Sequence, residues 1–356
     1  MGVANKNAAM IESVWTLSLP GLKFDRQTNY FDLGKDSLHA ITMLKKVQEV
    51  TEVEVPLSYF FSNPTIDGLT KYLVDDSMMN EADEYDQLIV PIANQKGTKT
   101  PIFFIHPARG SASPYFALAA KIAKGHPVYG IQAVGLSGVK EPLQSLELIA
   151  QNYYRAIKQR IGDKPFIVGG HSFGGNVASH VSMLSRFQGN PTPLLILFDP
   201  GTPQDVGNEF LNTDNPVYSA RFLAWFSVIL GQNNLPIITV DELKPLAEDE
   251  RIPYIVEKAK SIGTLPEGFD DGDYLSMAKI WHGCSQALLN SSMISFDAAT
   301  LYFEAAQGLC RSAIWQQYCE GEFEAISMDC NHIQILAQDF VGEIADSING
   351  FLADNL

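Results

Sequence analysis

Residues 165–184 read PFIVGGHSFGGNVASHVSML and contain the motif Gly170-His171-Ser172-Phe173-Gly174, a G-x-S-x-G. An apolar run precedes the motif and a helix-like stretch follows it, which is the strand, turn and helix context that this motif requires. A sharp turn here needs glycine beside the serine, because a Cβ would collide with the neighbouring strand or helix. An exposed hydroxyl at a helix N-terminus, where N–H groups favour negative charge, predicts that Ser172 is a nucleophile. The alternative is a purely structural turn.

Short β-rich apolar runs alternate with helical stretches on both sides of this motif. This alternation predicts a mostly parallel sheet with helices on both faces. One segment, from about 204 to 292, replaces the alternation with amphipathic helical patterns, and we interpret it as an inserted helical lid. The predicted strands cover residues 102–105, 128–131, 166–168, 194–198 and 301–303.

A serine hydroxyl needs a base, and the base needs an acid that orients it. Asp199 ends the run LLILFDP, so we expect its carboxylate at the carboxyl edge of the sheet beside Ser172. It could instead be a cap or turn residue ahead of Pro200. His332 follows the alternating segment FEAISMD and gives the order serine, aspartate, histidine of an α/β-hydrolase. Asp329 is the second choice for the acid.

The other histidines fit the role of general base less well. His171 lies inside the motif, and His180 and His282 lie within helical patterns typical of core or surface positions. His106 begins the loop 106–110, which follows the strand PIFFI. This loop can turn a backbone N–H toward the serine and, with the N–H of Phe173, form an oxyanion hole.

The N-terminal region has a different pattern. Apolar residues recur at three-residue steps within residues 11–73, which predicts a small bundle of four helices. Residues 75–87, DDSMMNEADEYDQ, carry six acids and no base, which is typical of a linker. We therefore predict a helical domain over 8–76, an acidic linker over 77–97 and an α/β domain over 98–356.

The second domain resembles type I thioesterases of non-ribosomal peptide and polyketide synthases over nearly all of 98–356. The resemblance is carried by residues 101–136, by GHSFGG and by Asn331-His332. It implies a triad of Ser172, Asp199 and His332, oxyanion donors at Ala108 and Phe173, and a mobile lid over an acyl channel. Arg109 stands where many relatives have a small residue; it can meet a substrate carboxylate or pair with an acid.

The first domain resembles peptidyl and acyl carrier domains in two segments, NYFDLGKDSL at 29–38 and VPLSYFFSNPTI at 55–66. In that family the serine of D-S-L, here Ser37, carries 4′-phosphopantetheine as an ester. The alternative is that Ser37 only caps the helix that follows it. NYFDLG favours a peptidyl over a polyketide carrier, and Lys35, which replaces a small residue common in the family, is expected to affect partner choice.

Composition limits the partners. A net charge of −16 argues against binding to nucleic acid, which depends on Lys and Arg. No apolar run reaches the roughly 20 residues that span a bilayer, and MGVANKN lacks a signal-peptide core, so we expect a cytoplasmic protein without a membrane partner. The four cysteines show no CxxC pairing and are expected to be buried thiols, with no metal site.

Together these features predict a chain-terminating thioesterase with its own carrier domain. A phosphopantetheinyl transferase would modify Ser37, upstream synthase modules would deliver an acyl or peptidyl thioester, and Ser172 would release the chain as a free acid or a macrocycle. Two alternatives stay open: a serine esterase or lipase with an unrelated helical domain, and a catalytically idle docking module. The short lead before the carrier region suggests a piece of a longer synthase or a stand-alone terminal protein.

Overall fold

The computed structural model of the chain describes residues 3–35, 37–74, 88–122, 124–136, 140–190, 194–204, 220–229, 237–263, 265, 268–308 and 311–356. Its internal contacts divide the chain into two compact units. The first comprises residues 1–83, 137–139 and 213–279, and the second comprises residues 84–136, 140–212 and 280–356.

The first unit begins with a small helical bundle, in agreement with the periodicity of the sequence. Trp15, which is fully buried, makes edge contacts with the rings of Phe24, Tyr30 and Phe60 at centroid distances of 5.6, 5.1 and 6.4 Å. These aromatic rings hold the helices around one core. The elements are α1 (Val3–Ser18), η1 (Tyr30–Leu33), α2 (Ser37–Thr51), α3 (Leu57–Ser62) and α4 (Ile66–Tyr72).

The same unit contains helices from the segment predicted as a lid. Phe222 and Phe226 pack against Tyr274 at centroid distances of 5.4 and 5.2 Å, and all three side chains are buried. The apolar face of this segment is therefore used for packing between its own helices; residues 205–219 and 230–236 lie outside the described residues. The helices are α10 (Ala220–Ile229), α11 (Val240–Leu243), α12 (Glu248–Ser261) and α13 (Asp271–Leu289), of which α13 continues into the second unit.

The second unit is built on a seven-stranded sheet with the strand order β1-β3-β2-β4-β5-β6-β7. All neighbouring pairs are parallel except β1 with β3. The mostly parallel sheet predicted from the alternation is confirmed. The strands are β1 (Ile89–Ala93), β2 (Ile102–Ile105), β3 (Val128–Ile131), β4 (Ile167–His171), β5 (Leu194–Phe198), β6 (Ala299–Gln307) and β7 (Phe323–Asn331).

Strand β1 falls inside the range 77–97 that the sequence analysis assigns to a linker. Its residues Ile89 and Val90 are buried and pair with β3 at the edge of the sheet. The strand contains Pro91, and an edge strand tolerates proline because one side needs no ladder hydrogen bonds. The acidic residues that precede β1 thus led to the prediction of a linker in a range that contains a short strand.

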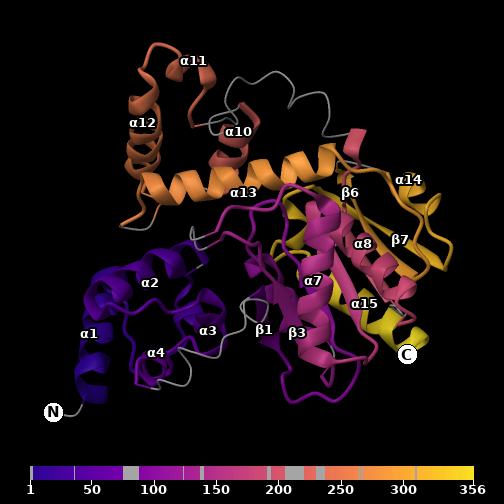
Figure 1. Cartoon of the computed structure of the whole chain (residues 1–356), viewed down its shortest axis with the longest axis horizontal. Coiled ribbons are helices and arrows are strands. Elements are labelled where there is room, and N and C mark those ends of the chain that lie inside the picture. The colour runs from indigo at the N-terminus through magenta and orange to yellow at the C-terminus, as the bar shows by residue number, and fades with distance from the viewer. Residues whose placement is uncertain are drawn as a thin grey trace. The chain divides into compact units, whose positions relative to one another are not determined.

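Helices cover both faces of the sheet (Figure 1). Side chains alternate along β2, so that Phe103 and Ile105 join one apolar cluster and Ile102 and Phe104 join the other. Helices α7 (Leu146–Ile161) and α8 (Phe173–Phe187) pack in the first cluster. Helices α6 (Phe116–Ala119) and α15 (Val341–Asn355) pack in the second. The remaining short elements are η3 (Ser113–Tyr115), α14 (Ser312–Gln316) and η5 (Gln334–Leu336).

Within the described residues, no helix has both the length and the apolar character needed to cross a membrane. Cys284 and Cys330 are buried free thiols and Cys319 is a half-buried one, whereas Cys310 lies outside the described residues.

Candidate active site

Ser172 lies on the sharp turn between β4 and α8, as its motif predicts. Its backbone has φ 56° and ψ −125°, a combination that a non-glycine residue adopts at a cost of about 1–3 kcal/mol. The Ser172 N–H donates to the Phe198 carbonyl at 3.0 Å, and the Gly175 N–H donates to the Ser172 carbonyl at 3.0 Å. The turn is therefore held from β5 and from the first turn of α8.

The glycines of the motif are required by space. A Cβ on Gly170 would lie 2.3 Å from the carbonyl carbon of Gly174, and a Cβ on Gly174 would lie 2.3 Å from the Ile105 carbonyl oxygen. Both neighbours are backbone atoms that cannot move aside. The sequence-based expectation that only glycine fits beside the serine agrees with these distances.

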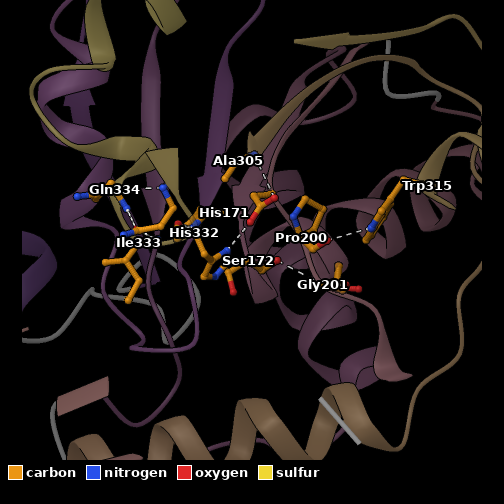
Figure 2. A network of polar contacts seen from close by, with 12 residues as sticks. His171, Ser172, Pro200, Gly201, Ala305, Trp315, His332, Ile333 and Gln334 are labelled. Carbon is orange, nitrogen blue, oxygen red and sulfur yellow. Dashed lines mark hydrogen bonds and ion pairs between the residues drawn. The ribbon is translucent and has the colours of Figure 1, made fainter. Parts of the chain in front are cut away.

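His332 lies beside Ser172 in Figure 2, and its ring contacts Asp199, the residue directly after β5. Nδ1 of His332 is 2.7 Å from Oδ2 of Asp199, whose side chain is fully buried. Since a carboxylate only accepts, Nδ1 carries a proton, and in the neutral ring Nε2 has the free lone pair. Asp329, the second choice for the acid, is exposed on β7.

The Asp199 carboxylate is fixed by further contacts that no sequence pattern predicts. Its Oδ1 accepts a hydrogen bond from the Ala305 N–H at 3.2 Å. Gly308 lies so close that a Cβ there would be 2.2 Å from Oδ1. The N–H of Ala305 and the backbone of Gly308 thus lie directly against the Asp199 carboxylate and restrict its position.

The loop 106–110 follows β2, the neighbour of β4, so its residues lie at the same edge of the sheet as Ser172. Ala108 lies in a turn that the Gly110 N–H closes by donating to the Pro107 carbonyl at 2.9 Å. Phe173 is the first residue of α8. The two backbone positions predicted as oxyanion donors therefore come after adjacent strands, Ala108 in the loop after β2 and Phe173 after the turn that ends β4.

The ring of His106, the first residue of this loop, is held by two hydrogen bonds. Its Nδ1 donates to the Pro107 carbonyl at 2.7 Å, so its Nε2 accepts from the Tyr153 hydroxyl at 2.6 Å. Burial lowers the pKa of His106 to about 4. His106 is consequently a neutral structural histidine at physiological pH. The pKa of His171 is lowered first by burial, then by the His332 imidazole, with a smaller contribution from the positive charge of Arg109 in the same loop.

Ser37 is the first residue of α2, and α2 has no acidic residue in its first turn. The first N–H groups of a helix have no partner within it and favour an anion. The position therefore fits a phosphodiester such as that of phosphopantetheine.

A serine on a strand-to-helix elbow, with an aspartate and a histidine from the ends of later strands of one parallel sheet, places the second domain in the α/β-hydrolase class. Residues 100–352 match the family model of the thioesterase domain, and residues 16–73 match that of the phosphopantetheine attachment site. The chain belongs to the thioesterase domain family, with a phosphopantetheine attachment domain ahead of the thioesterase.

The similar curated proteins include several that are named as nonribosomal peptide synthases or synthetases. A dimodular nonribosomal peptide synthase of Bacillus subtilis (strain 168) is 25% identical over 335 residues, which are 92% of this chain and 13% of that protein. Malpinin synthetase of Mortierella alpina is 30% identical over 324 residues, which are 91% of this chain and 4% of that protein. The chain thus spans a small part of the length of these relatives.

Solved structures share the fold. A holo four-domain nonribosomal peptide synthetase bound to AMP and glycine matches with a TM-score of 0.68 at 19% identity, over 99% of this chain and 26% of that one. The NocB thioesterase domain, in covalent complex with a fluorophosphonate nocardicin G analogue, matches with a TM-score of 0.53 at 15% identity, over 74% of this chain and 99% of that domain.

Proposed function

We propose that this chain ends carrier-dependent synthesis by moving an acyl or peptidyl chain from its carrier domain to Ser172 and then releasing it. The observation that carries the proposal is the 2.7 Å contact of His332 with buried Asp199, beside a serine on a strained elbow. Such an arrangement supplies a nucleophile, a general base and an acid that orients the base.

In the first half of the reaction, Oγ of Ser172 attacks the thioester carbonyl carbon while Nε2 of His332 takes the hydroxyl proton. Asp199 stabilises the imidazolium that results. The N–H groups of Ala108 and Phe173 stabilise the oxyanion, at about 3 kcal/mol for each donor. The carbon–sulfur bond then breaks, and His332 returns the proton to the departing sulfur.

In the second half, His332 takes a proton from the nucleophile that attacks the ester on Ser172. With water the product is a free acid, and with an amine or hydroxyl of the chain itself the product is a macrocycle. In both cases the proton passes to Oγ of Ser172 and restores the enzyme. The same residues therefore serve hydrolysis and cyclisation.

Ser37 is the residue that would hold the prosthetic group. When bound there, phosphopantetheine supplies a flexible arm whose terminal thiol carries the chain as a thioester. The match of residues 16–73 to the phosphopantetheine attachment site and the position of Ser37 at the start of α2 support this assignment. A phosphopantetheinyl transferase and upstream synthase modules are the partners that follow from it.

Two experiments test the two active serines separately. Incubation with coenzyme A and a phosphopantetheinyl transferase should add one phosphopantetheine to the wild type and to Ser13→Ala, which changes an exposed serine of α1, but not to Ser37→Ala. Intact mass measures the addition. Absence of the added mass on the wild type would favour an esterase with an unrelated helical domain.

A fluorophosphonate probe should label the wild type and Ser347→Ala, a change on α15, but neither Ser172→Ala nor His332→Ala. Turnover of an acyl-pantetheine thioester should be lost in the same two variants. A wild type that resists the probe would mean that the triad is idle and that the chain acts as a docking module.

A further inference from the structure

His171, the residue before the nucleophile, has a buried polar side chain that takes part in none of the reaction steps described above. It is the last residue of β4, and the residue is 8% exposed. A buried imidazole is costly unless it is hydrogen-bonded. Its contacts therefore indicate what it does.

The backbone of His171 is tied to the neighbouring strand through a tyrosine. Its N–H donates to the hydroxyl of Tyr115 at 2.8 Å, and that hydroxyl donates to the Ile105 carbonyl at 2.7 Å. Tyr115 is fully buried. The backbone of His171, from which the side chain extends, is thus fixed relative to the turn that carries Ser172.

The side chain of His171 reaches from the elbow to the loop of the general base. Its Nε2 is 2.9 Å from the backbone carbonyl of His332. A carbonyl can only accept, so Nε2 of His171 carries a proton. The two imidazole rings lie 4.6 Å apart at 35°, as neighbours in Figure 2.

His332 directly follows Asn331, the last residue of β7, which pairs with Gln307 of β6. Oδ1 of Asn331 accepts from the N–H groups of Ile333 and Gln334, both at 3.0 Å, which fixes the shape of the turn. The bond to Asp199 holds one ring nitrogen of His332. The bond from His171 adds a contact at the His332 carbonyl itself, in the peptide group next to the Cα from which the ring pivots.

The charge of His171 matters as much as its geometry. Burial, and then the neighbouring imidazole of His332, lower the pKa of His171 well below its usual range. The residue accordingly stays neutral while His332 becomes an imidazolium during the reaction. A permanent cation at this distance would oppose that change.

We propose that His171 is a positioning residue, which as a neutral Nε2–H donor clamps the His332 carbonyl and so sets the place of the general base relative to Ser172. The inference rests on the proposed function. It gives the elbow motif a second role, since one segment then positions both the nucleophile and the base.

Substitutions that keep or remove the donor test this role. His171→Phe keeps a ring but removes the N–H, and we expect kcat for an acyl-pantetheine thioester to fall on the order of 10- to 100-fold with KM nearly unchanged, since a misplacement of about 1 Å can cost about 100-fold. His171→Gln, whose amide can reach the same carbonyl, should recover most of kcat. The matched control is His180→Phe on α8, which removes another buried imidazole bonded to a backbone carbonyl, and should keep kcat.

The outcomes separate this inference from the proposed function. A wild type without turnover or probe labelling would reject the proposed function itself. An active wild type with equal kcat in His171→Phe, or with equal losses in His171→Phe and His171→Gln, would reject the clamp alone.

A measurement on the wild type keeps the test valid if the variants fail to fold. In protein labelled with ¹⁵N-histidine, His171 should show a protonated Nε2 and an unprotonated Nδ1 from pH 5 to 8. A protonated Nδ1, or a cationic ring, within this range would overturn the proposal.

Discussion

Replacing Gly308 by alanine should disable the candidate site although no residue of the predicted triad is replaced. The new Cβ would lie 2.2 Å from Oδ1 of Asp199 and 2.5 Å from Oδ2. Carbon–oxygen contacts of this kind need about 3 Å or more, so the carboxylate has to retreat by roughly 1 Å. Both of its oxygens are already bonded, to Ala305 N–H and to His332 Nδ1, and a retreat of that size breaks one of these bonds.

The expected loss in kcat is on the order of 100-fold if the carboxylate shifts and His332 follows, and it approaches 10,000-fold if the contact with His332 is lost, as for removal of a triad acid. The loss of one buried hydrogen bond should lower the free energy of unfolding by about 1–3 kcal/mol. Steady-state turnover of an acyl-pantetheine thioester and urea unfolding measure the two effects.

The control is Gly342→Ala in α15, where an added Cβ meets no atom within 4 Å. That change should leave kcat unaltered and raise stability by about 0.5–1 kcal/mol, since alanine favours a helix over glycine. The reasoning would be refuted if Gly308→Ala kept the wild-type kcat and the low-field Nδ1 proton of His332 did not shift. The Asp199 carboxylate would then have accommodated the new Cβ without moving.

Three further outcomes follow from the contacts described. Burial lowers the pKa of His106 from 6.5 to about 4, so as pH falls the unfolded chain binds a proton at this imidazole before the folded chain does. The free energy of unfolding should therefore fall by about 3 kcal/mol as pH drops from 6.5 to about 4. Urea titrations of His106→Gln should show a shallower dependence of this free energy on pH. Gly174→Ala sets a Cβ 2.3 Å from the Ile105 carbonyl oxygen, so little folded thioesterase domain is expected in a soluble-expression assay; a folded, active variant would contradict the close approach. Burial raises the pKa of the Cys284 thiol far above its usual range, so this thiol should react with a disulfide reagent only after unfolding, as a mass map of the labelled peptides would show.

Much of the second domain could be predicted from sequence because its signals are local. The elbow joins a strand, a turn and a helix within 20 residues, so the pattern of apolar residues and glycines suffices to recognise it. Asp199 was predicted because residues at the carboxyl ends of parallel strands share one edge, and His332 because it completes the order serine, aspartate, histidine. Their contact at 2.7 Å agrees with that prediction, while their catalytic roles stay a proposal.

Contacts between distant segments could not be predicted in the same way. His171 and His332 are 161 residues apart, and no periodicity relates the side chain of one to the carbonyl of the other. Gly308 carries no signal either, because a glycine after a strand is ordinary until the neighbouring carboxylate is placed. Strand β1 was missed because its short apolar run contains a proline and follows an acidic stretch, two features that individually indicate a loop.

The chain leaves the sheet at the end of β5 and re-enters beside it, with Leu194 paired to Ala299 in unbroken parallel register. About one hundred residues are therefore inserted between two adjacent strands. Asp199 begins this insertion, and the end of α13 anchors it in the core of the second unit through Ile280 and Cys284. We expect that the middle of the insertion can change in length, in evolution or by engineering, while both ends and the reacting groups keep their spacing.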